Sequence, residues 1–215
     1  MDCINLNSPL TNIYDRQDGI DCFTNKSAMV IGCGGVGSWI AIDLALIGVG
    51  TVILIDPDKL ESSNLNRTLF KLNQVGSYKT KALHELILER RPDTIVVTIE
   101  DIFQTHLLDK YNVDFIFDAT DNLATRQLIK ETRDKHMINY CKSGYDGFNA
   151  TISLNDFDSG RWGDDGSYTV VPSFFGTPQI ESALAVIEML LVDGNRSKSV
   201  NFNVKKLLNK IKDTQ

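Results

Sequence analysis

The chain has 215 residues, a length that suits one globular domain over residues 1–215. Its formal net charge of −6 at pH 7, with lysines and arginines scattered along the sequence, argues against nucleic acid as a partner. The longest apolar stretch, residues 39–49, contains Asp43 and is too short to span a bilayer, so we expect a cytoplasmic protein that does not enter membranes.

After an N-terminal arm over residues 1–26, the chain alternates short β-branched runs with helical periodicity as far as residue 145. This alternation is typical of a mostly parallel sheet flanked by helices. It predicts strands over residues 27–32, 51–56, 94–99, 114–119 and 137–141. It predicts helices over residues 36–47, 78–90 and 122–135. We therefore expect an α/β, Rossmann-like fold.

The pattern changes after Gly144. Residues 148–154 alternate like a strand, and residues 155–171 are rich in Gly, Asp and Ser, which predicts a mobile crossover loop. An apolar helix is predicted over residues 179–191 and a basic amphipathic helix over residues 202–212. Together these elements predict a short strand-and-helix extension at the C-terminal side of the sheet.

Four cysteines are present without any C-x-x-C pair: Cys3, Cys22, Cys33 and Cys141. Their spacing predicts neither a zinc site nor a disulfide framework, so we expect reduced thiols and no zinc. Cys141 ends a predicted strand near the ligand edge of the sheet, where it fits either a small buried side chain or a nucleophile. The choice depends on the pKa of the thiol, which the sequence does not give.

The segment G-C-G-G-V-G follows the first strand and opens the first helix. Gly32, Gly34 and Gly37 fit the G-x-G-x-x-G spacing, and the N–H groups at such a helix start favour phosphate oxygens. Gly35 allows a still closer approach. Asp56 ends the next strand, where its carboxylate can accept hydrogen bonds from ribose hydroxyls. These residues predict an adenine nucleotide and leave open whether it is a redox dinucleotide or ATP.

Further polar residues follow the second and fourth predicted strands. Asn64 and Arg67 lie in S-S-N-L-N-R, where an amide and a guanidinium can contact a polyphosphate, and Lys79 opens the next helix as a further cation. Asp118 and Asp121 end the fourth strand, at the edge where open α/β sheets bind ligands. Asp121 can hold Mg2+ there, or it can cap the following helix.

The ordered set G-C-G-G-V-G, Asp56, S-N-L-N-R, Lys79 and D-A-T-D-N resembles the ThiF/MoeB/HesA family, the ubiquitin-activating-enzyme-like adenylyltransferases. The resemblance extends over residues 14–145 and includes Y-D-R-Q at residues 14–17. It implies binding of ATP and Mg2+. It also implies activation of a carboxylate as an acyl-adenylate with release of pyrophosphate. The carboxylate is often the C-terminal glycine of a ubiquitin-like protein partner.

The resemblance also implies roles for single residues. Asp56 would hold the ribose, and Asp121 would position Mg2+. Arg16 would reach the phosphates of the neighbouring subunit in a homodimer. The phosphates of the chain's own site would be surrounded by Asn64, Arg67 and Lys79. The residues with catalytic roles would thus be Arg16, Arg67, Lys79 and Asp121.

The sequence departs from the family pattern at several positions. Ile13 and Thr68 replace a common Arg and Gln, and residues 155–171 contain no cysteine to take up an activated acyl group. Two alternatives stay open. The glycine fingerprint alone fits an NAD(P)-dependent oxidoreductase, and the missing loop cysteine fits a non-catalytic module that binds a nucleotide and a partner. The identity of the carboxylate substrate is not readable from these residues.

Overall fold

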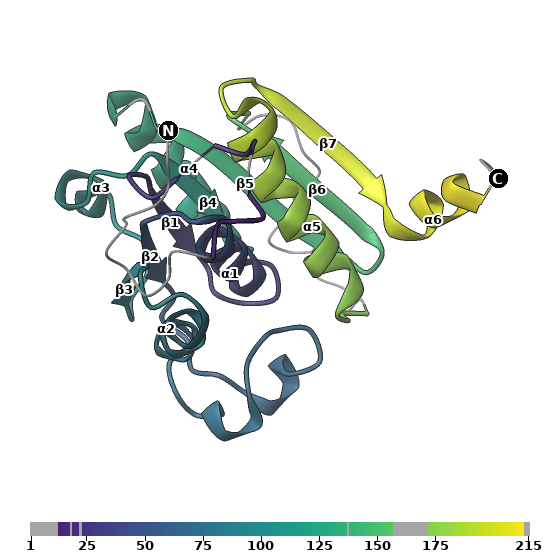
Figure 1. Cartoon of the computed structure of the whole chain (residues 1–215), viewed down its shortest axis with the longest axis horizontal. Coiled ribbons are helices and arrows are strands. Elements are labelled where there is room, and N and C mark those ends of the chain that lie inside the picture. The colour runs from purple at the N-terminus through teal and green to yellow at the C-terminus, as the bar shows by residue number, and fades with distance from the viewer. Residues whose placement is uncertain (1–12, 18, 22, 137, 157–171, 213–215) are drawn as a thin grey trace.

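The structure, a computed structural model, describes residues 13–17, 19–21, 23–136, 138–156 and 172–212. Within these residues, seven strands form one sheet in the order β3-β2-β1-β4-β5-β6-β7 (Figure 1). The strands are β1 (Ser27–Ile31), β2 (Thr51–Ile55), β3 (Ile95–Ile99), β4 (Phe115–Asp118), β5 (Asn139–Asp146), β6 (Asn149–Leu154) and β7 (Lys198–Asn203). The first five strands are parallel, whereas β6 and β7 are antiparallel to their neighbours.

Helices cover both faces of the sheet. They are α1 (Gly37–Ile47), α2 (Lys79–Arg90), α3 (His106–Lys110), α4 (Leu123–His136), α5 (Gly176–Ile187) and α6 (Val204–Lys212). The helices α1, α2 and α5 supply one buried cluster, and α3 and α4 supply the other. Short 3-10 turns at Ser62–Asn64 and Leu72–Gln74 lie between β2 and α2, and α5 continues as a π-helical segment over Glu188–Asp193.

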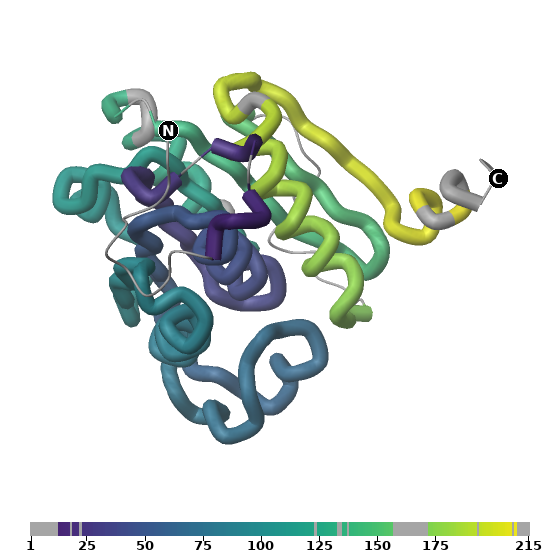
Figure 2. Tube along the Cα trace, viewed as in Figure 1, coloured from purple at the N-terminus to yellow at the C-terminus, as the bar shows by residue number. Residues whose placement is uncertain are grey.

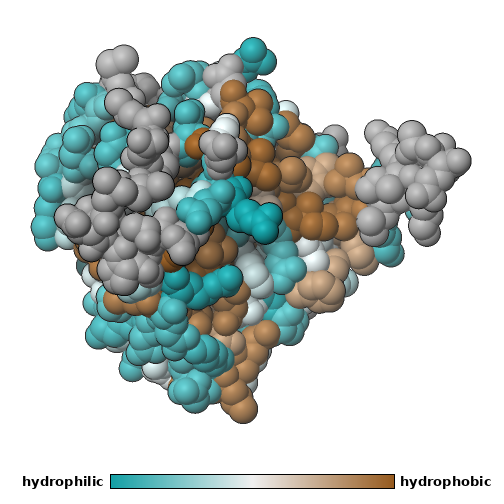
Figure 3. Space-filling model, in the orientation of Figure 1, coloured by the Kyte–Doolittle hydropathy of each residue, from teal (hydrophilic) through white to brown (hydrophobic). Residues whose placement is uncertain are grey.

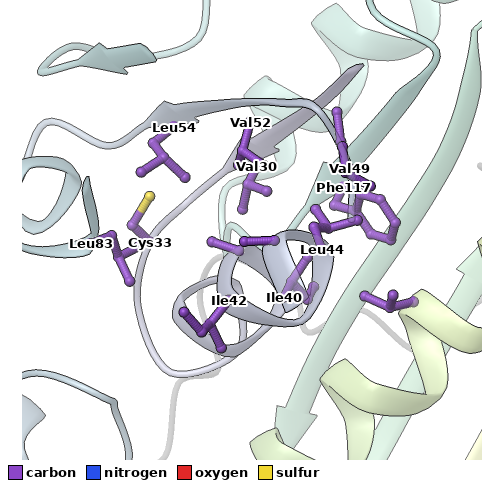
Figure 4. Close-up of a cluster of buried hydrophobic side chains, with 14 of the residues drawn as sticks. Val30, Cys33, Ile40, Ile42, Leu44, Val49, Val52, Leu54, Leu83 and Phe117 are labelled. Carbon is purple, nitrogen blue, oxygen red and sulfur yellow. The ribbon is translucent and has the colours of Figure 1, made fainter. Parts of the chain in front are cut away.

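The central strand β1 is buried on both faces, which explains its continuous apolar run. Val30 faces α1, where it packs with Ile40 and Leu44 in the cluster shown in Figure 4. Met29 faces the other cluster, with α3 and α4. The chain runs outward from β1 to β2 and β3 on one side, and then crosses from β3 to β4 on the other side of β1. The strand order reverses between β1 and β4, and such a switch point is where open α/β sheets bind ligands.

The expected α/β, Rossmann-like fold is confirmed, and each predicted strand and helix is present with boundaries shifted by a few residues. The largest shift is in β5, predicted over residues 137–141, which continues to Asp146 because it pairs antiparallel with β6. The predicted helix over residues 202–212 begins only at Val204, because residues before it form β7. Neither β7 nor the five-residue α3 was predicted.

Two expectations concern segments that are only partly described. Of the predicted crossover loop, residues 155–171, only Asn155 and Asp156 are among the described residues. The N-terminal arm is described from residue 13, with Asp18 and Cys22 excepted. In the described part of the chain, no helix combines the length and apolar character needed to cross a membrane.

Candidate nucleotide site

The glycine loop joins β1 to α1 at the carboxyl edge of the sheet. Gly32 has φ +85°, and a Cβ there would lie 2.9 Å from the carbonyl oxygen of Ala119. A Cβ on Gly37 would lie 1.8 Å from the carbonyl oxygen of Gly32. Gly34, in contrast, has no such neighbour within 4 Å. The first and last glycines are therefore required by close backbone packing, whereas Gly34 has open space beside it and a Cβ on Gly35 would lie 2.9 Å from the hydroxyl oxygen of Tyr145.

The glycine loop presents backbone N–H groups at the start of α1. Val36 is the N-cap of α1 and has no side-chain capping bond. No hydrogen bond from the N–H groups of Gly34, Gly35 or Val36 to another described residue is formed. The first N–H groups of a helix have no intrahelical acceptor, and together with the helix dipole they favour an anion. This arrangement fits a phosphate group.

Asp56 lies directly beside this loop, at the end of β2. Its Oδ2 accepts a 2.7 Å hydrogen bond from the Cys33 N–H, and its Oδ1 accepts a 2.8 Å hydrogen bond from the Asp58 N–H. The side chain is only 5% exposed. Each carboxylate oxygen has a second lone pair, so the group can still accept hydrogen bonds from ribose hydroxyls.

Lys79 begins α2 and points back to the end of β2. Its Nζ lies 2.7 Å from Oδ2 of Asp58 and 3.7 Å from Oδ1 of Asp56. The predicted cation is thus adjacent to the predicted ribose ligand. Sequence reasoning missed Asp58 as its partner, although the spacing D-P-D places a second carboxylate two residues after Asp56. In this arrangement a nucleotide phosphate would compete with Asp58 for the lysine.

Arg67 lies in the loop after β2 and is tied to α1, because its carbonyl accepts a 3.0 Å hydrogen bond from Nε1 of Trp39. Its Nη1 donates to the carbonyl of Ser63 at 2.7 Å and to Oδ1 of Asn66 at 2.9 Å. Among the described residues, the guanidinium forms no ion pair. Its charge is therefore available to a phosphate.

Asn64 has a structural role in the same loop. Its Oδ1 accepts a 3.0 Å hydrogen bond from the Glu61 N–H, which caps the 3-10 turn Ser62–Asn64. Its carbonyl accepts a 2.8 Å hydrogen bond from the hydroxyl of Thr68, the residue that replaces the family's common Gln. Asn64 thus orders the loop that carries Arg67, and its direct phosphate contact stays a prediction.

Asp121 lies in the turn between β4 and α4, and its side chain is exposed. The alternative role of Asp121 as a helix cap is wrong, because Asn122 caps α4. Oδ1 of Asn122 accepts hydrogen bonds from the N–H groups of Ala124 at 2.8 Å and Thr125 at 3.3 Å. No group of three or more His, Cys, Asp or Glu side chains that could hold a metal ion occurs in the described part of the chain. A cation at Asp121 would need further ligands from a nucleotide and water.

Asp118 is fully buried just before this turn. Its Oδ2 accepts a 3.0 Å hydrogen bond from the Tyr140 hydroxyl, and its Oδ1 lies 3.1 Å from Nζ of Lys142. Oδ1 also accepts the N–H of Thr120 at 3.0 Å and its hydroxyl at 2.8 Å. Sequence reasoning missed both Tyr140 and Lys142. The sequence signal was weak, because β5 also contains Asn139, Ser143 and Asp146.

Arg16 lies far from the other predicted site residues in the same chain. The turn that carries it packs at the C-terminal end of α1, where Nε2 of Gln17 donates a 3.1 Å hydrogen bond to the carbonyl of Ile47. The ring of Tyr14 lies against Gly48, the residue after the helix (purple turn in Figure 2). The glycine loop is at the other end of α1, and a helix of 11 residues is about 16 Å long.

Neither described cysteine has the environment of a nucleophile. Cys33 and Cys141 are both buried and free, whereas Cys3 and Cys22 lie outside the described residues. Burial raises the pKa of the Cys141 thiol to about 12, so its thiolate is scarce at neutral pH. The geometry favours the packing role for Cys141.

A hollow of about 460 Å³ lies at the opposite, amino edge of the sheet, where Lys26 and Asp114 form a 2.8 Å ion pair. None of the residues predicted to contact a nucleotide lines it. The carboxyl edge carries the glycine loop, the cations and the carboxylates. The candidate site is therefore identified by the types of side chain and backbone group at the carboxyl edge, and not by the volume of the hollow.

Comparisons with known proteins agree with the fold. The model of the ThiF family matches residues 9–179. The tRNA threonylcarbamoyladenosine dehydratase of Bacillus subtilis is 31% identical over 120 residues, which are 54% of this chain and 47% of that protein. Ubiquitin-like modifier-activating enzyme 5 of Caenorhabditis elegans is 28% identical over 148 residues, 63% of this chain and 34% of that protein. The chain thus spans about half or less of the length of these relatives.

A similar solved structure is that of Escherichia coli MccB with MccA-N7isoASN. It has a TM-score of 0.71 and 21% sequence identity, and the match covers 93% of this chain and 73% of that chain. MccB has also been crystallised with ATP. At this level of identity the likeness shows a shared fold.

Proposed function

This chain belongs to the ThiF family, and we propose on that premise that it is an ATP-dependent adenylyltransferase that activates a carboxylate. The observation that supports the proposal is that four features follow the carboxyl ends of the central strands β1, β2 and β4. These are the N–H groups of the glycine loop, the buried carboxylate of Asp56, the cations of Arg67 and Lys79, and the exposed carboxylate of Asp121.

The residues present fit ATP. The triphosphate would lie on the N-terminus of α1, where the N–H groups of Gly34 and Gly35 donate to no acceptor among the described residues. The ribose would lie on Asp56, whose position is fixed by the Cys33 N–H. Arg67 and Lys79 would contact phosphate oxygens. The complex of MccB with ATP, a protein of the same fold, supports this choice of nucleotide.

Asp121 would hold Mg2+ together with phosphate oxygens. Mg2+ in nucleotide sites is bound by one or two carboxylates, substrate phosphates and water, and a single exposed aspartate suits that pattern. The ion would neutralise charge on the phosphates. Zinc is not expected, because the sequence lacks paired C-x-x-C ligands.

The reaction needs no general base. A carboxylate substrate is already ionised at neutral pH and attacks the α-phosphorus of ATP directly. A bond forms between the carboxylate oxygen and phosphorus, the bond to the bridging oxygen breaks, and pyrophosphate leaves with the electron pair. Negative charge gathers on the phosphates, where the guanidinium of Arg67 and the ammonium of Lys79 would stabilise it.

We propose a protein or peptide terminus as the carboxylate. One of the relatives is named as an activating enzyme for a ubiquitin-like modifier, and MccB was crystallised with MccA-N7isoASN. A ubiquitin-like protein is one partner of this class. These names favour nucleotidyl transfer over the hydride transfer of an NAD(P)-dependent oxidoreductase. A non-catalytic role would require that the cations and Asp121 bind nucleotide without turnover.

A homodimer is the second part of the proposal. Arg16 is separated from its own glycine loop by the length of α1, so it would act on the nucleotide of a neighbouring copy. The outer face of α5 supports an interface, because it exposes a row of apolar side chains that forms an apolar band in Figure 3. These side chains are Ile180, Leu184 and Ile187, followed by Leu191 in the π-helical segment that continues α5.

The test is exchange of labelled pyrophosphate into ATP in the presence of candidate carboxylates. Asp121→Ala is expected to abolish exchange that the parent chain supports. Asp109→Ala is the matched control, because Asp109 is 74% exposed and, within the part of the chain that the structure describes, its ion pair is with His136. Full exchange by the Asp121 variant would contradict the Mg2+ assignment. Binding of NAD in preference to ATP would contradict the proposed activity.

A further inference from the structure

Lys142 is a buried lysine in the middle of β5, close to the candidate site but not part of the predicted constellation. Its side chain is only 5% exposed. Burying an ammonium group is unfavourable unless the group is paired and hydrogen-bonded. Lys142 meets this condition through two acceptors, Oδ1 of Asp118 at 3.1 Å and the carbonyl oxygen of Thr120.

Both acceptors belong to the turn that leads from β4 to α4. Asp118 is the last residue of β4, and Thr120 is the second residue after it. The hydroxyl and the N–H of Thr120 also bind Oδ1 of Asp118, and the Tyr140 hydroxyl binds Oδ2. The ammonium of Lys142 therefore bridges Asp118 at the start of the turn and Thr120 in its middle.

The same turn touches the glycine loop on one side. A Cβ on Gly32 would lie 2.9 Å from the carbonyl oxygen of Ala119, and a Cβ on Gly37 would lie 3.2 Å from the Cβ of Ala119. This contact leaves no space for the turn to move toward the loop. On the other side, the residue after Thr120 is Asp121. The turn thus connects the phosphate-binding loop to the proposed Mg2+ ligand.

We propose that Lys142 is a positioning residue of the nucleotide site, which acts through the turn 118–121 to fix Asp121 relative to the glycine loop. The inference rests on the proposed function, because it assumes that Asp121 holds the cation bound to ATP. Lys142 itself touches neither nucleotide nor metal. Its role is to hold the backbone at Thr120, so that the carboxylate of Asp121 is already in position and little conformational entropy is lost when Mg2+ binds.

A purely stabilising ion pair is the rival explanation, and the two differ in what they predict for Mg2+. Removal of a stabilising pair lowers the stability of the whole chain and leaves the Mg2+ response of the folded fraction unchanged. Removal of a positioning residue loosens one turn and weakens the binding of Mg2+ in particular. Lys198 on β7 supplies the matched control, because it forms an ion pair with Glu188 far along the sheet from β4.

The first experiment is calorimetric titration of Mg2+ into the full chain in the presence of ATP. In Lys142→Met we expect the half-saturating Mg2+ concentration to rise roughly tenfold, as is usual when a group that orients a metal ligand is removed. Affinity for ATP in chelator is expected to stay within about twofold. Lys142→Arg is expected to restore most of the Mg2+ response, and Lys198→Met to leave it unchanged.

Lys142→Met leaves Asp118 buried without its cation, so this variant can fail to fold. Two further variants keep the inference testable. Asp118→Asn combined with Lys142→Met removes both charges, and Tyr140→Phe removes only one hydrogen bond to Asp118. We expect a weakened Mg2+ response in both, about twofold to threefold in Tyr140→Phe, because the turn keeps its other hydrogen bonds.

A second readout needs neither metal nor nucleotide. Amide hydrogen exchange in the apo chain is expected to accelerate at residues 119–122 in the folded variants and to stay unchanged in β1 and β2. Exchange that accelerates uniformly, or a Mg2+ response equal to that of the parent chain in folded Lys142→Met or Tyr140→Phe, would overturn the inference. If the parent chain itself binds ATP without any response to Mg2+ or Asp121→Ala, the proposed function fails instead.

Discussion

Oδ2 of Asp56 accepts a 2.7 Å hydrogen bond from the backbone N–H of Cys33, so the carboxylate that ends β2 holds the first turn of the glycine loop after β1. The proposed ribose ligand is therefore also a structural part of the phosphate loop. A change at Asp56 should affect the fold and the nucleotide together.

Replacement of Asp56 by alanine is the first prediction. It leaves the N–H groups of Cys33 and Asp58 without their acceptor, which should lower the free energy of unfolding by about 1–3 kcal/mol. ATP binding should weaken as well. Urea denaturation and calorimetry measure the two effects. Asp58→Ala is the control for stability, because the Asp58 side chain is 65% exposed; an Asp56 variant as stable as this control would contradict the structural role.

The glycines of the loop supply a matched pair of substitutions. Gly37→Ala places a Cβ 1.8 Å from the carbonyl oxygen of Gly32, so we expect displacement of the loop and a loss of about 1–3 kcal/mol. Gly34→Ala meets nothing within 4 Å and should change stability by less than about 0.5 kcal/mol. Thermal unfolding without nucleotide distinguishes the two. Equal melting temperatures would show that the loop is less tightly packed than described.

Arg91 joins the N-terminal turn to α1, although it is far from the nucleotide site. It is 2% exposed, donates to the carbonyls of Ala45 and Leu46, and forms a forked ion pair with Asp93 at 3.0 and 2.7 Å. Arg91→Ala removes a buried guanidinium, so that Asp93 loses its cation and the carbonyls of Ala45 and Leu46 lose a donor. We therefore expect a loss of about 3–5 kcal/mol in chemical denaturation. The exposed Arg90→Ala is the control and should change stability by less than about 0.5 kcal/mol.

Asp43 supplies a prediction about pH. Burial raises the pKa of its carboxyl from 3.8 to about 6, although a hydrogen bond from Ser182 opposes this. The folded chain then binds more protons than the unfolded chain between these values. The resulting contribution to stability is present below pH 3.8 and is lost as pH rises through about 6.

Asp43→Asn removes this titration and keeps the shape of the side chain. The free energy of unfolding of the variant, relative to that of the parent chain, should be up to about 3 kcal/mol higher at pH 7.5 than at pH 4. This is the free energy that corresponds to raising the pKa from 3.8 to about 6. Denaturation curves of both chains from pH 4 to 7.5 measure the difference. A constant difference across this range would contradict the shifted pKa.

The role of Arg16 in a neighbouring copy predicts complementation. Arg16→Ala and Asp121→Ala should each be inactive alone. In a mixed dimer, one site combines an intact Asp121 with the intact Arg16 of the other chain. Random exchange of subunits should therefore restore about a quarter of the parent activity. No recovery after proven subunit exchange would place Arg16 outside the partner's site.

Much of the parallel sheet could be predicted, because β1 and β2 are continuous apolar runs and the glycine loop ends the first of them. The strand β7 could not, because only Val200 and Phe202 in its six residues are apolar. Its Lys198 pairs with Glu188, and its Asn201 accepts a 2.6 Å hydrogen bond from Thr151, contacts that exist only after folding. The same applies to α3, whose five residues give no clear period.

The site, like the fold, contains residues that the sequence predicts and residues that only the folded structure brings together. Asp56 and Lys79 were predicted and lie next to each other, with 3.7 Å between Oδ1 and Nζ. Lys142 was missed because it is distant from Asp118 in sequence, and only the parallel pairing of β4 with β5 places the two side by side. Asn122 was missed as the cap of α4, because Asp121 and Asn122 are both good capping residues and only the folded turn decides between them.

The central claim is a site for ATP with Mg2+, and ligand-dependent thermal stability tests it most directly. The account predicts that ATP raises the melting temperature, that Mg2+ increases the shift and that Asp121→Ala removes this increase. It predicts no comparable shift with NAD. Stabilisation by NAD alone, or by ATP to the same extent with and without Mg2+, would contradict it.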